Sequence, residues 1–331
     1  MNITLVPSDN GLGHIKRIAF LANYLSKFFK VNLIASKKNL ASFFIDKKIK
    51  IINTKLNLSV QQNRYNFSWY NFLSKKIINK TDLFVCDNLP EIYKLNKKSL
   101  VFANFFWHHI LKINKKKKQE LNDLIKNSNK PVICNYLFAS KQIKKKYKIK
   151  KIGFFGNFKG RKKKFIKNIL ISIGTAKLNY LTKKKINKEI MDFFESVDDK
   201  GINFFVDPLI ELKKNKHIKC KIHKANFSSN MYRKIDLAII KPGLGTINDC
   251  LQNAIPIVTL SKPFNKEFKF NALILKKNNL GFDISSFRLI NKILAIIKND
   301  NNFFSKYFLR CKKLQWNGEK QFYRLIKYSN F

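Results

Sequence analysis

Short apolar runs alternate with loops and helical patterns from the first residues of the chain. The first run is Ile3–Val6, and the turn-rich loop 8–13 follows it. Apolar residues then recur at helical spacing from residue 14 to residue 29, and Val31–Ala35 is the second run. Two strands joined through a helix form a βαβ unit, whose strands pair in parallel with a right-handed crossover. The sequence therefore predicts an α/β fold built on parallel sheets.

The same pattern recurs in two series, and a length of 331 residues also favours two domains. Glycines among Lys and Phe between residues 153 and 160 indicate a linker. Both domains should be Rossmann-like, with doubly wound parallel sheets. Ligands bind beyond the carboxyl ends of such strands, so we expect the two sheets to face each other with their strand ends on either side of one cleft. We expect a first domain at 1–152, a linker at 153–166, a second domain at 167–308 and a C-terminal helix at 309–331 that packs back toward the first domain. Further predicted strands lie at 83–86, 100–103, 131–134, 168–175, 203–206, 237–240 and 255–258.

The net charge of +47 would usually suggest a nucleic-acid partner. Arg, which groove-reading proteins favour for its bidentate fork, accounts for only seven of the 67 basic residues. Lys, Asn, Ile and Phe have A/T-rich codons, so genomic base composition explains the skew. We therefore expect no nucleic acid, and an anionic membrane surface stays open as a partner. The predicted solvated lysine runs are 115–118, 144–146, 162–164 and 183–185.

Neither a membrane span nor a secretory leader is expected. No run reaches 18 apolar residues, and the first residues resemble a strand with no basic segment before it. The five cysteines lack paired spacing, which argues against disulfides and a zinc site and fits a reducing cytosol. We expect a cytoplasmic protein, with peripheral association on the inner face of the cell membrane left open.

The first candidate motif, Gly11–Arg17, joins the first strand to its helix. Its glycines permit a tight turn and a close backbone approach to a ligand. His14 falls at the N-terminus of the helix, whose positive end favours the neutral imidazole that can act as a base. The alternative is that His14 only caps or packs.

The second candidate motif is a strand, a glycine-rich loop and a helix that should begin near Thr246. Backbone N–H groups at such a helix start form an anion site suited to phosphates. Thr246 could cap the helix and donate to a phosphate, and Asp249 could bind a ribose diol. The alternative is a capping box of Thr246 and Asp249 without a ligand.

These motifs, followed by the segment 263–272 after the next strand, resemble the two-domain nucleotide-sugar glycosyltransferases of the GT-B fold. Within that group the motifs resemble those of the peptidoglycan N-acetylglucosaminyltransferase and the UDP-glucuronosyltransferase-like enzymes. The resemblance implies transfer of a sugar from a nucleotide diphosphate sugar, expected to be UDP-linked, to a hydroxyl of a sugar or lipid-linked acceptor in cell-envelope glycan or glycolipid synthesis. It implies inversion and neither a metal nor a further cofactor. The donor-site residues that it implies are Gly13, Gly174, Thr175, Phe227, Met231, Gly243, Gly245, Thr246, Asp249, Glu267 and Asn271.

The resemblance also implies catalytic roles in the first domain. His14 would be the general base, and Asp87 would orient it; alternatively, Asp87 caps a helix that begins at Leu89 and Pro90. The aromatic stretch 105–109 falls where relatives bind the acceptor, although core aromatics are the simpler interpretation. The sequence departs from the family at Asp249, where Glu is usual, and at Phe268, where a donor-binding Gln is usual. It also has a single glycine, Gly174, where relatives often have two.

Three other functions remain open. The stretch 13–17 also resembles a UDP-sugar hydrolase of nonulosonic-acid synthesis, in which a loop His activates water. A basic nucleic-acid-binding protein and an inactive GT-B scaffold are the other two. The oligomeric state is not predicted.

Overall fold

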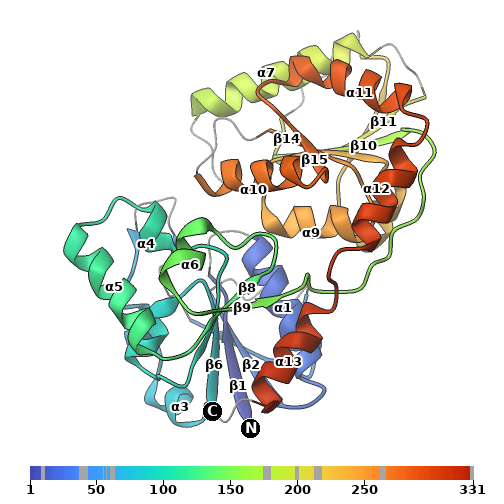
Figure 1. Cartoon of the computed structure of the whole chain (residues 1–331). Helices are drawn as coiled ribbons and strands as arrows, with labels where there is room; N and C mark the ends of the chain where they lie inside the picture. The colour runs from blue at the N-terminus through green and yellow to red at the C-terminus, as the bar shows by residue number, and fades with distance from the viewer. Residues whose placement is uncertain are drawn as a thin grey trace. The chain divides into compact units, whose positions relative to one another are not determined.

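The computed structural model describes residues 1–8, 12–36, 44–54, 56, 58–59, 64–173, 180–197, 201–211, 218–260 and 266–328. The chain divides into two compact units. Unit 1 comprises Met1–Gly156 and Gln315–Phe331, and unit 2 comprises Asn157–Leu314. Each unit is an α/β structure built around its own sheet (Figure 1). Among the described residues, no helix is long and apolar enough to cross a bilayer.

The main sheet of unit 1 has seven parallel strands in the order β3-β2-β1-β6-β7-β8-β9. The chain adds strands on one side as far as β3 and then returns to the other side of β1. The strand order therefore reverses between β1 and β6, as it does in a doubly wound sheet. The strands are β1 (Asn2–Val6), β2 (Lys30–Ala35), β3 (Lys50–Asn53), β6 (Leu83–Asp87), β7 (Leu100–Phe102), β8 (Val132–Asn135) and β9 (Ile149–Ile152), and β4 (Leu58–Ser59) pairs separately with β5 (Arg64–Tyr65).

Alternate side chains of these strands enter two separate cores, because successive residues of a strand point to opposite faces. Ile3 and Val85 pack in the core that α1 (Leu12–Leu25) and α13 (Gly318–Tyr328) cover. Phe84 packs in the opposite core, under the other helices of the unit. Those helices are η2 (Trp69–Phe72), α3 (Lys75–Asn79), η3 (Pro90–Lys94), α4 (Trp107–Ile110), α5 (Lys115–Asn127) and α6 (Lys141–Lys146).

The C-terminal helix α13 belongs to unit 1 and is held by the segment at residues 153–156. The backbone N–H of Gly318 donates to the carbonyl of Phe154 over 2.8 Å. A Cβ at Gly318 would lie only 2.4 Å from the carbonyl oxygen of Gly153, so no larger residue fits this crossing. The Gly156 N–H also donates to the buried Glu319 carboxylate over 2.9 Å. Residues 153–156 are therefore a structural contact of the last helix, rather than only a linker.

The sheet of unit 2 repeats the topology with six parallel strands in the order β12-β11-β10-β13-β14-β15. Here the strand order reverses between β10 and β13. The strands are β10 (Asn168–Ser172), β11 (Asn203–Val206), β12 (Lys221–Lys224), β13 (Leu237–Ile240), β14 (Ile257–Leu260) and β15 (Gly281–Ile284). The helices are α7 (Tyr180–Ser196), α8 (Ser229–Lys234), α9 (Leu244–Gln252), α10 (Lys266–Lys277), η4 (Phe287–Leu289), α11 (Ile290–Asn299) and α12 (Phe303–Lys312).

One lysine of the predicted solvated runs is buried instead. Lys163 donates from Nζ to the carbonyl of Ile235 over 2.6 Å, and it pairs with Asp236 Oδ1 at 3.2 Å. Burial lowers the pKa of Lys163, while Asp236 opposes that shift. A buried ammonium needs such partners, and here they join the first residues of unit 2 to the start of β13.

Candidate functional site

Both sheets place polar residues at the carboxyl ends of the two strands between which the strand order reverses. In doubly wound sheets this reversal opens a crevice beyond the strand ends, where ligands bind. In unit 1 these strands are β1, followed by His14 at the start of α1, and β6, which ends at Asp87. In unit 2 they are β10, which ends at Ser172, and β13, followed by Lys241 and helix α9. The fold thus brings together residues far apart in the sequence.

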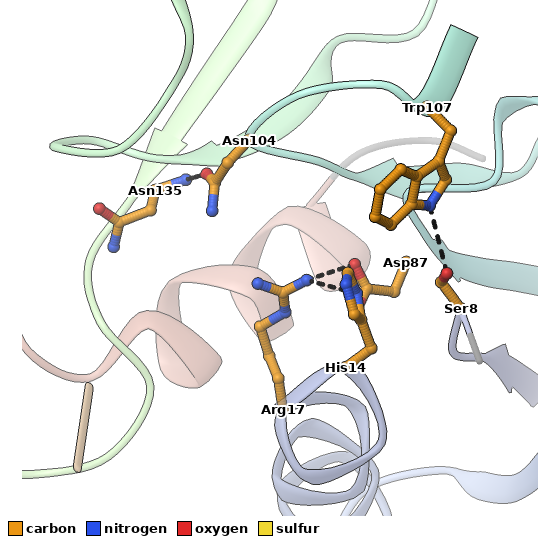
Figure 2. Close-up of polar contacts among 7 residues, drawn as sticks. All are labelled: Ser8, His14, Arg17, Asp87, Asn104, Trp107 and Asn135. Atoms are coloured by element: carbon orange, nitrogen blue, oxygen red, sulfur yellow. Dashed lines mark hydrogen bonds and ion pairs between the residues drawn. The ribbon is translucent and has the colours of Figure 1, made fainter. Parts of the chain in front are cut away.

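Three side chains of unit 1 form a connected cluster, which Figure 2 shows. His14 Nδ1 lies 3.0 Å from Asp87 Oδ2, and Arg17 Nη2 donates to Asp87 Oδ1 over 2.5 Å. Arg17 Nη2 also lies 3.2 Å from His14 Nδ1. The Asp87 side chain is fully buried, whereas the side chains of His14 and Arg17 are 13% and 17% exposed. The buried Asp87 carboxylate therefore holds the His14 imidazole and the Arg17 guanidinium, both of which are partly exposed to solvent.

The charges of this cluster assign the tautomer of the imidazole. Burial raises the pKa of Asp87, but the Arg17 guanidinium and His14 outweigh it, and the net shift is downward. An ionised carboxylate accepts hydrogen bonds only, so we assign the Nδ1 proton of His14 to the bond with Asp87. The Nε2 lone pair is then left to accept a proton. This is the arrangement in which a carboxylate holds a His as a base.

Other polar groups continue this end of the sheet of unit 1. Trp107 Nε1 donates to Ser8 Oγ over 3.2 Å, and the Trp107 ring lies 6.0 Å from that of His14 (Figure 2). Asn104 Oδ1 accepts the backbone N–H of Asn135 over 2.8 Å. These residues follow or end β1, β7 and β8. Polar side chains therefore gather where a doubly wound sheet binds ligands.

The alternative role of Asp87 as a helix cap is wrong. The short helix after β6, η3, begins at Pro90, and no side chain caps it. Instead the chain turns sharply at Asn88, whose φ of 62° lies in the left-handed region. Asp87 therefore ends its strand with its carboxylate bound to α1 residues rather than to its own helix.

The aromatic stretch 105–109 is mostly core, as the simpler interpretation held. Phe106, His108 and His109 are buried. His108 Nε2 and His109 Nε2 each lie 3.2 Å from Asn122 Oδ1. Burial lowers the pKa of His108 to about 3 and that of His109 to about 4, so both imidazoles are neutral. Of this stretch, Trp107 is the residue that contacts the His14 cluster.

In unit 2 the predicted helix start is wrong by two residues. Helix α9 begins at Leu244, its N-cap is Gly243, and no side chain caps it. Thr246 is therefore the third helical residue, and the capping box of Thr246 and Asp249 does not form. The reason is local: Gly243 has extended dihedrals and reaches the cap position first. The first N–H groups of a helix lack intrahelical partners, so this end can still bind an anion.

A buried lysine, which the sequence motifs did not single out as a site residue, lies beside this helix start. Lys241 is 8% exposed, and its Nζ lies 4.9 Å from the centre of the Phe268 ring. Burial lowers its pKa to about 8, although the charges of Glu267 and Asp207 oppose the shift. Asp207 itself accepts a 2.9 Å hydrogen bond from Ser172 Oγ. The Lys241 ammonium therefore lies near the carboxylates of Glu267 and Asp207 at the carboxyl end of this sheet.

The remaining predicted donor-site residues have separate environments. Asn271 is buried and donates to the carbonyl of Pro242 over 3.0 Å, so it holds the loop before α9. Asp249 accepts a hydrogen bond from the buried Tyr232 hydroxyl, which raises the pKa of that tyrosine together with burial. Phe227 adopts a φ of 53°, and Met231 is buried at the start of α8. Gly174 and Thr175 lie outside the described residues.

Solved structures similar to this chain cover nearly its whole length. The spinosyn rhamnosyltransferase SpnG complexed with thymidine diphosphate aligns with a TM-score of 0.66 at 12% identity, over 99% of this chain and 100% of that chain. The Streptomyces sp. SF2575 glycosyltransferase SsfS6, also complexed with thymidine diphosphate, has a TM-score of 0.59 at 13% identity, over 99% and 100% of the two chains. Arabidopsis thaliana UGT89C1 complexed with quercetin has a TM-score of 0.67 at 12% identity, over 98% of each chain.

This chain has the GT-B fold. The fold predicted from the sequence is confirmed as two parallel-sheet α/β units of seven and six strands. No protein-family profile and no curated protein matches the sequence.

Two residues of this GT-B chain were missed from the sequence for different reasons. Arg17 lies one helical turn after His14, so both residues reach the same side of α1, and this spacing was a usable signal. Lys241 was one of 67 basic residues, and only its burial distinguishes it. Among the described residues, no group of three or more His, Cys, Asp or Glu side chains is placed to hold a metal ion.

Proposed function

We propose that this protein is a glycosyltransferase that moves a sugar from a nucleotide diphosphate sugar to a hydroxyl group. The observation that carries the proposal is the His14–Asp87 pair at the strand-order reversal of a GT-B sheet. The solved neighbours support it, since SpnG and SsfS6 were both crystallised with thymidine diphosphate, and SpnG also with spinosyn aglycone. We propose a UDP-linked donor, and thymidine diphosphate is the competing nucleotide.

In this proposal unit 2 binds the donor. The N–H groups at the start of α9, at Gly245 and Thr246, would hold the diphosphate, because the positive end of a helix stabilises anions. The same N–H groups would stabilise the charge that develops on the departing nucleotide, and each donor of this kind contributes about 3 to 4 kcal/mol. Asp249 would bind the ribose, and Glu267 the sugar. Phe227 would lie along the base, and Asn271 would act through Pro242 by fixing the loop. Gly174, Thr175, Met231 and Gly243 complete the proposed donor-binding set of unit 2, and Gly13 of unit 1 is proposed as a further donor-binding residue.

Unit 1 supplies the base. His14 Nε2 would accept the proton of the acceptor hydroxyl while the hydroxyl oxygen attacks the anomeric carbon of the donor sugar. The bond between that carbon and the diphosphate oxygen breaks, and the nucleoside diphosphate leaves. Asp87 holds the imidazole through Nδ1 and stabilises its protonated form. The proposal includes inversion, in which the acceptor oxygen would attack the face of the sugar opposite the departing phosphate.

The substitution His14→Ala tests the base. We expect a fall in kcat of about 10²- to 10⁴-fold, measured as release of nucleoside diphosphate from a panel of nucleotide sugars. Binding of UDP or thymidine diphosphate, measured by calorimetry, should be unchanged. The exposed His223, which stacks on Phe205 in unit 2, gives the control His223→Ala. Unchanged turnover of the His14 variant would contradict the assignment.

The hydrolase is the competing activity, because the same base could activate water. The resemblance of the stretch 13–17 to that hydrolase supports it, since Asp87 would hold His14 in the same way for either nucleophile. Incubation with a UDP-sugar and no acceptor separates the two reactions. Rapid release of free sugar would identify a hydrolase, whereas release only on addition of a hydroxyl acceptor would identify a transferase.

We also propose a place for the reaction. The acceptor would be a sugar or a lipid-linked glycan of the cell envelope, made at the inner face of the membrane. The resemblance to glycosyltransferases of envelope synthesis supports this acceptor, and the edge of the nearly buried Trp107 ring beside His14 would form part of its pocket. Fractionation of the native enzyme between supernatant and membranes tests the location directly.

A further inference from the structure

The outer face of helices α1 and α13 in unit 1 combines exposed aromatic rings with lysines. The two helices lie side by side (Figure 1). The Phe28 ring, just past the end of α1, packs 4.3 Å from the Tyr323 ring of α13, and 5.7 Å from the ring of Tyr24. Phe28 nevertheless remains 49% exposed, and Tyr328 at the end of α13 is 73% exposed. Tyr24 and Tyr323 are partly buried beneath Phe28. The exposed rings here are therefore Phe28 of the cluster and Tyr328 at the end of α13, and exposed aromatic rings on adjacent helices suit an interaction surface.

Cations lie over these rings. Lys27 Nζ lies 5.6 Å from the centre of the Tyr24 ring, and Lys327 Nζ lies 5.4 Å from the centre of the Tyr328 ring. No residue of 12–30 or of 320–328 is acidic. The neighbouring acid Glu319 is buried, and its carboxylate accepts the N–H of Gly156. The face therefore carries positive charge that its own residues do not neutralise.

We propose that this face, defined by Tyr24, Lys27, Phe28, Tyr323, Lys327 and Tyr328, docks unit 1 on an anionic lipid bilayer. The inference deepens the membrane location proposed above and rests on that proposal. It does not need the sugar-transfer chemistry. It names the surface, which neither the fold nor the solved neighbours indicate.

The chemistry of the face favours a bilayer over an acidic protein. Tyrosine and lysine side chains suit the boundary between headgroups and acyl chains, because each joins an apolar part to a polar end. A lysine whose ammonium lies over an exposed ring would place a cation and an aromatic group at the same depth in the bilayer. Helices that lie in an interface bind through apolar area on one face and attraction to anionic headgroups. A net charge of +47 adds long-range attraction to the same partner.

Vesicle co-flotation of the full chain tests the proposal. We expect binding to vesicles that contain phosphatidylglycerol, release of the protein by salt, and little binding to phosphatidylcholine alone. The double variant Lys27→Gln with Lys327→Gln should weaken partition by about 25-fold, because each cation contributes about fivefold. The double variant Phe28→Ser with Tyr328→Ser should weaken it by roughly tenfold or more through lost apolar burial. Both exposed pairs can be changed without opening a core.

Matched controls separate a defined face from diffuse charge. Lys115→Gln with Lys116→Gln makes the same charge change at exposed residues of α5, and Phe72→Ser removes an aromatic that is 55% exposed. Full binding by these controls supports the proposal. Equal loss in the control and test lysine pairs, binding unaffected by the aromatic pair, or no binding to phosphatidylglycerol would overturn it. Nucleotide release with a soluble acceptor should stay unchanged in all four variants, so failure here leaves the proposed function standing.

Discussion

Two buried carboxylates, Asp87 at the end of β6 and Glu91 four residues later in η3, have opposite pKa shifts. Asp87 binds a guanidinium and an imidazole, and its pKa is lowered although burial acts to raise it. Glu91 accepts from Trp69 Nε1 over 3.1 Å and from the Tyr65 hydroxyl over 3.2 Å, and burial raises its pKa to about 7. Neutral donors thus fail to offset the cost of burying a charge, whereas one adjacent cation offsets it.

The two carboxylates also give stability opposite dependences on pH. Asp87 has a lowered folded pKa, so its stabilisation is present above the unfolded pKa and is lost as pH falls through the folded pKa. Glu91 has a raised folded pKa, so stability is highest below the unfolded pKa and is lost as pH rises to about 7. Only the ionised member of this pair can hold an imidazole as a base.

The largest expected effect comes from removing the charge of Asp87. Asp87→Asn keeps the shape of the side chain but no longer fixes the Nδ1 proton or stabilises the imidazolium. We expect kcat to fall by about 10³- to 10⁴-fold, measured as nucleotide release at saturating donor. The control is Asp82→Asn, which changes an exposed carboxylate that accepts the N–H of Asn2. Comparable activity in the two variants would remove Asp87 from the mechanism.

The next effect is on stability and concerns Glu91. A pKa of about 7 against the ordinary 4.5 corresponds to about 3 kcal/mol of unfolding free energy, lost as pH rises between these values. Glu91→Gln should abolish this loss. All three tryptophans belong to unit 1, so tryptophan fluorescence in denaturant follows this unit. The free-energy curves of the two proteins should converge at low pH and separate toward neutral pH, and parallel curves would show that Glu91 is ionised throughout.

The smallest effect concerns Arg17, whose partly exposed guanidinium neutralises the charge of the buried Asp87 carboxylate. In Arg17→Gln the carboxylate loses its guanidinium partner and is held by the imidazole alone. We expect kcat/KM to fall by about tenfold, because a charge-assisted hydrogen bond that positions Asp87 is lost. Arg17→Lys should restore most of the wild-type kcat/KM, and Arg324→Gln, at an exposed residue of α13, serves as the control. Unchanged kcat/KM in Arg17→Gln would limit Arg17 to a structural role.

The central strands were predictable from the sequence, and the edge strands were not. Buried strands such as Leu83–Asp87 and Leu237–Ile240 are continuous apolar runs, because both faces of the sheet are covered. The sequence pattern missed the short separate pair β4 and β5, and within the two parallel sheets it missed β3, β9, β12 and β15, which are the edge strands. Lysines interrupt three of them, as in Ile149–Ile152, and such charges protect sheet edges from pairing with other chains.

The candidate site was predictable where the position of a residue at the end of a predicted strand is enough to place it. His14 and Asp87 each follow or end a predicted strand, and carboxyl ends of parallel strands meet at one edge, so their proximity follows from topology. The helix start near Thr246 failed because Gly243 and Thr246 are both acceptable caps, and backbone geometry chooses between them. Lys241 could not be found, because burial depends on the packing of Phe268 from a later helix.

Unit 1 is discontinuous in the chain: its helix α13 comes after every residue of unit 2. Its core includes Phe322 and Ile326 of that helix, which cover the same face of the sheet as α1. During synthesis, unit 2 is therefore complete in sequence before unit 1 is. The unit that carries the candidate base cannot complete its core until helix α13 has been synthesised, and part of its apolar sheet face stays exposed until then.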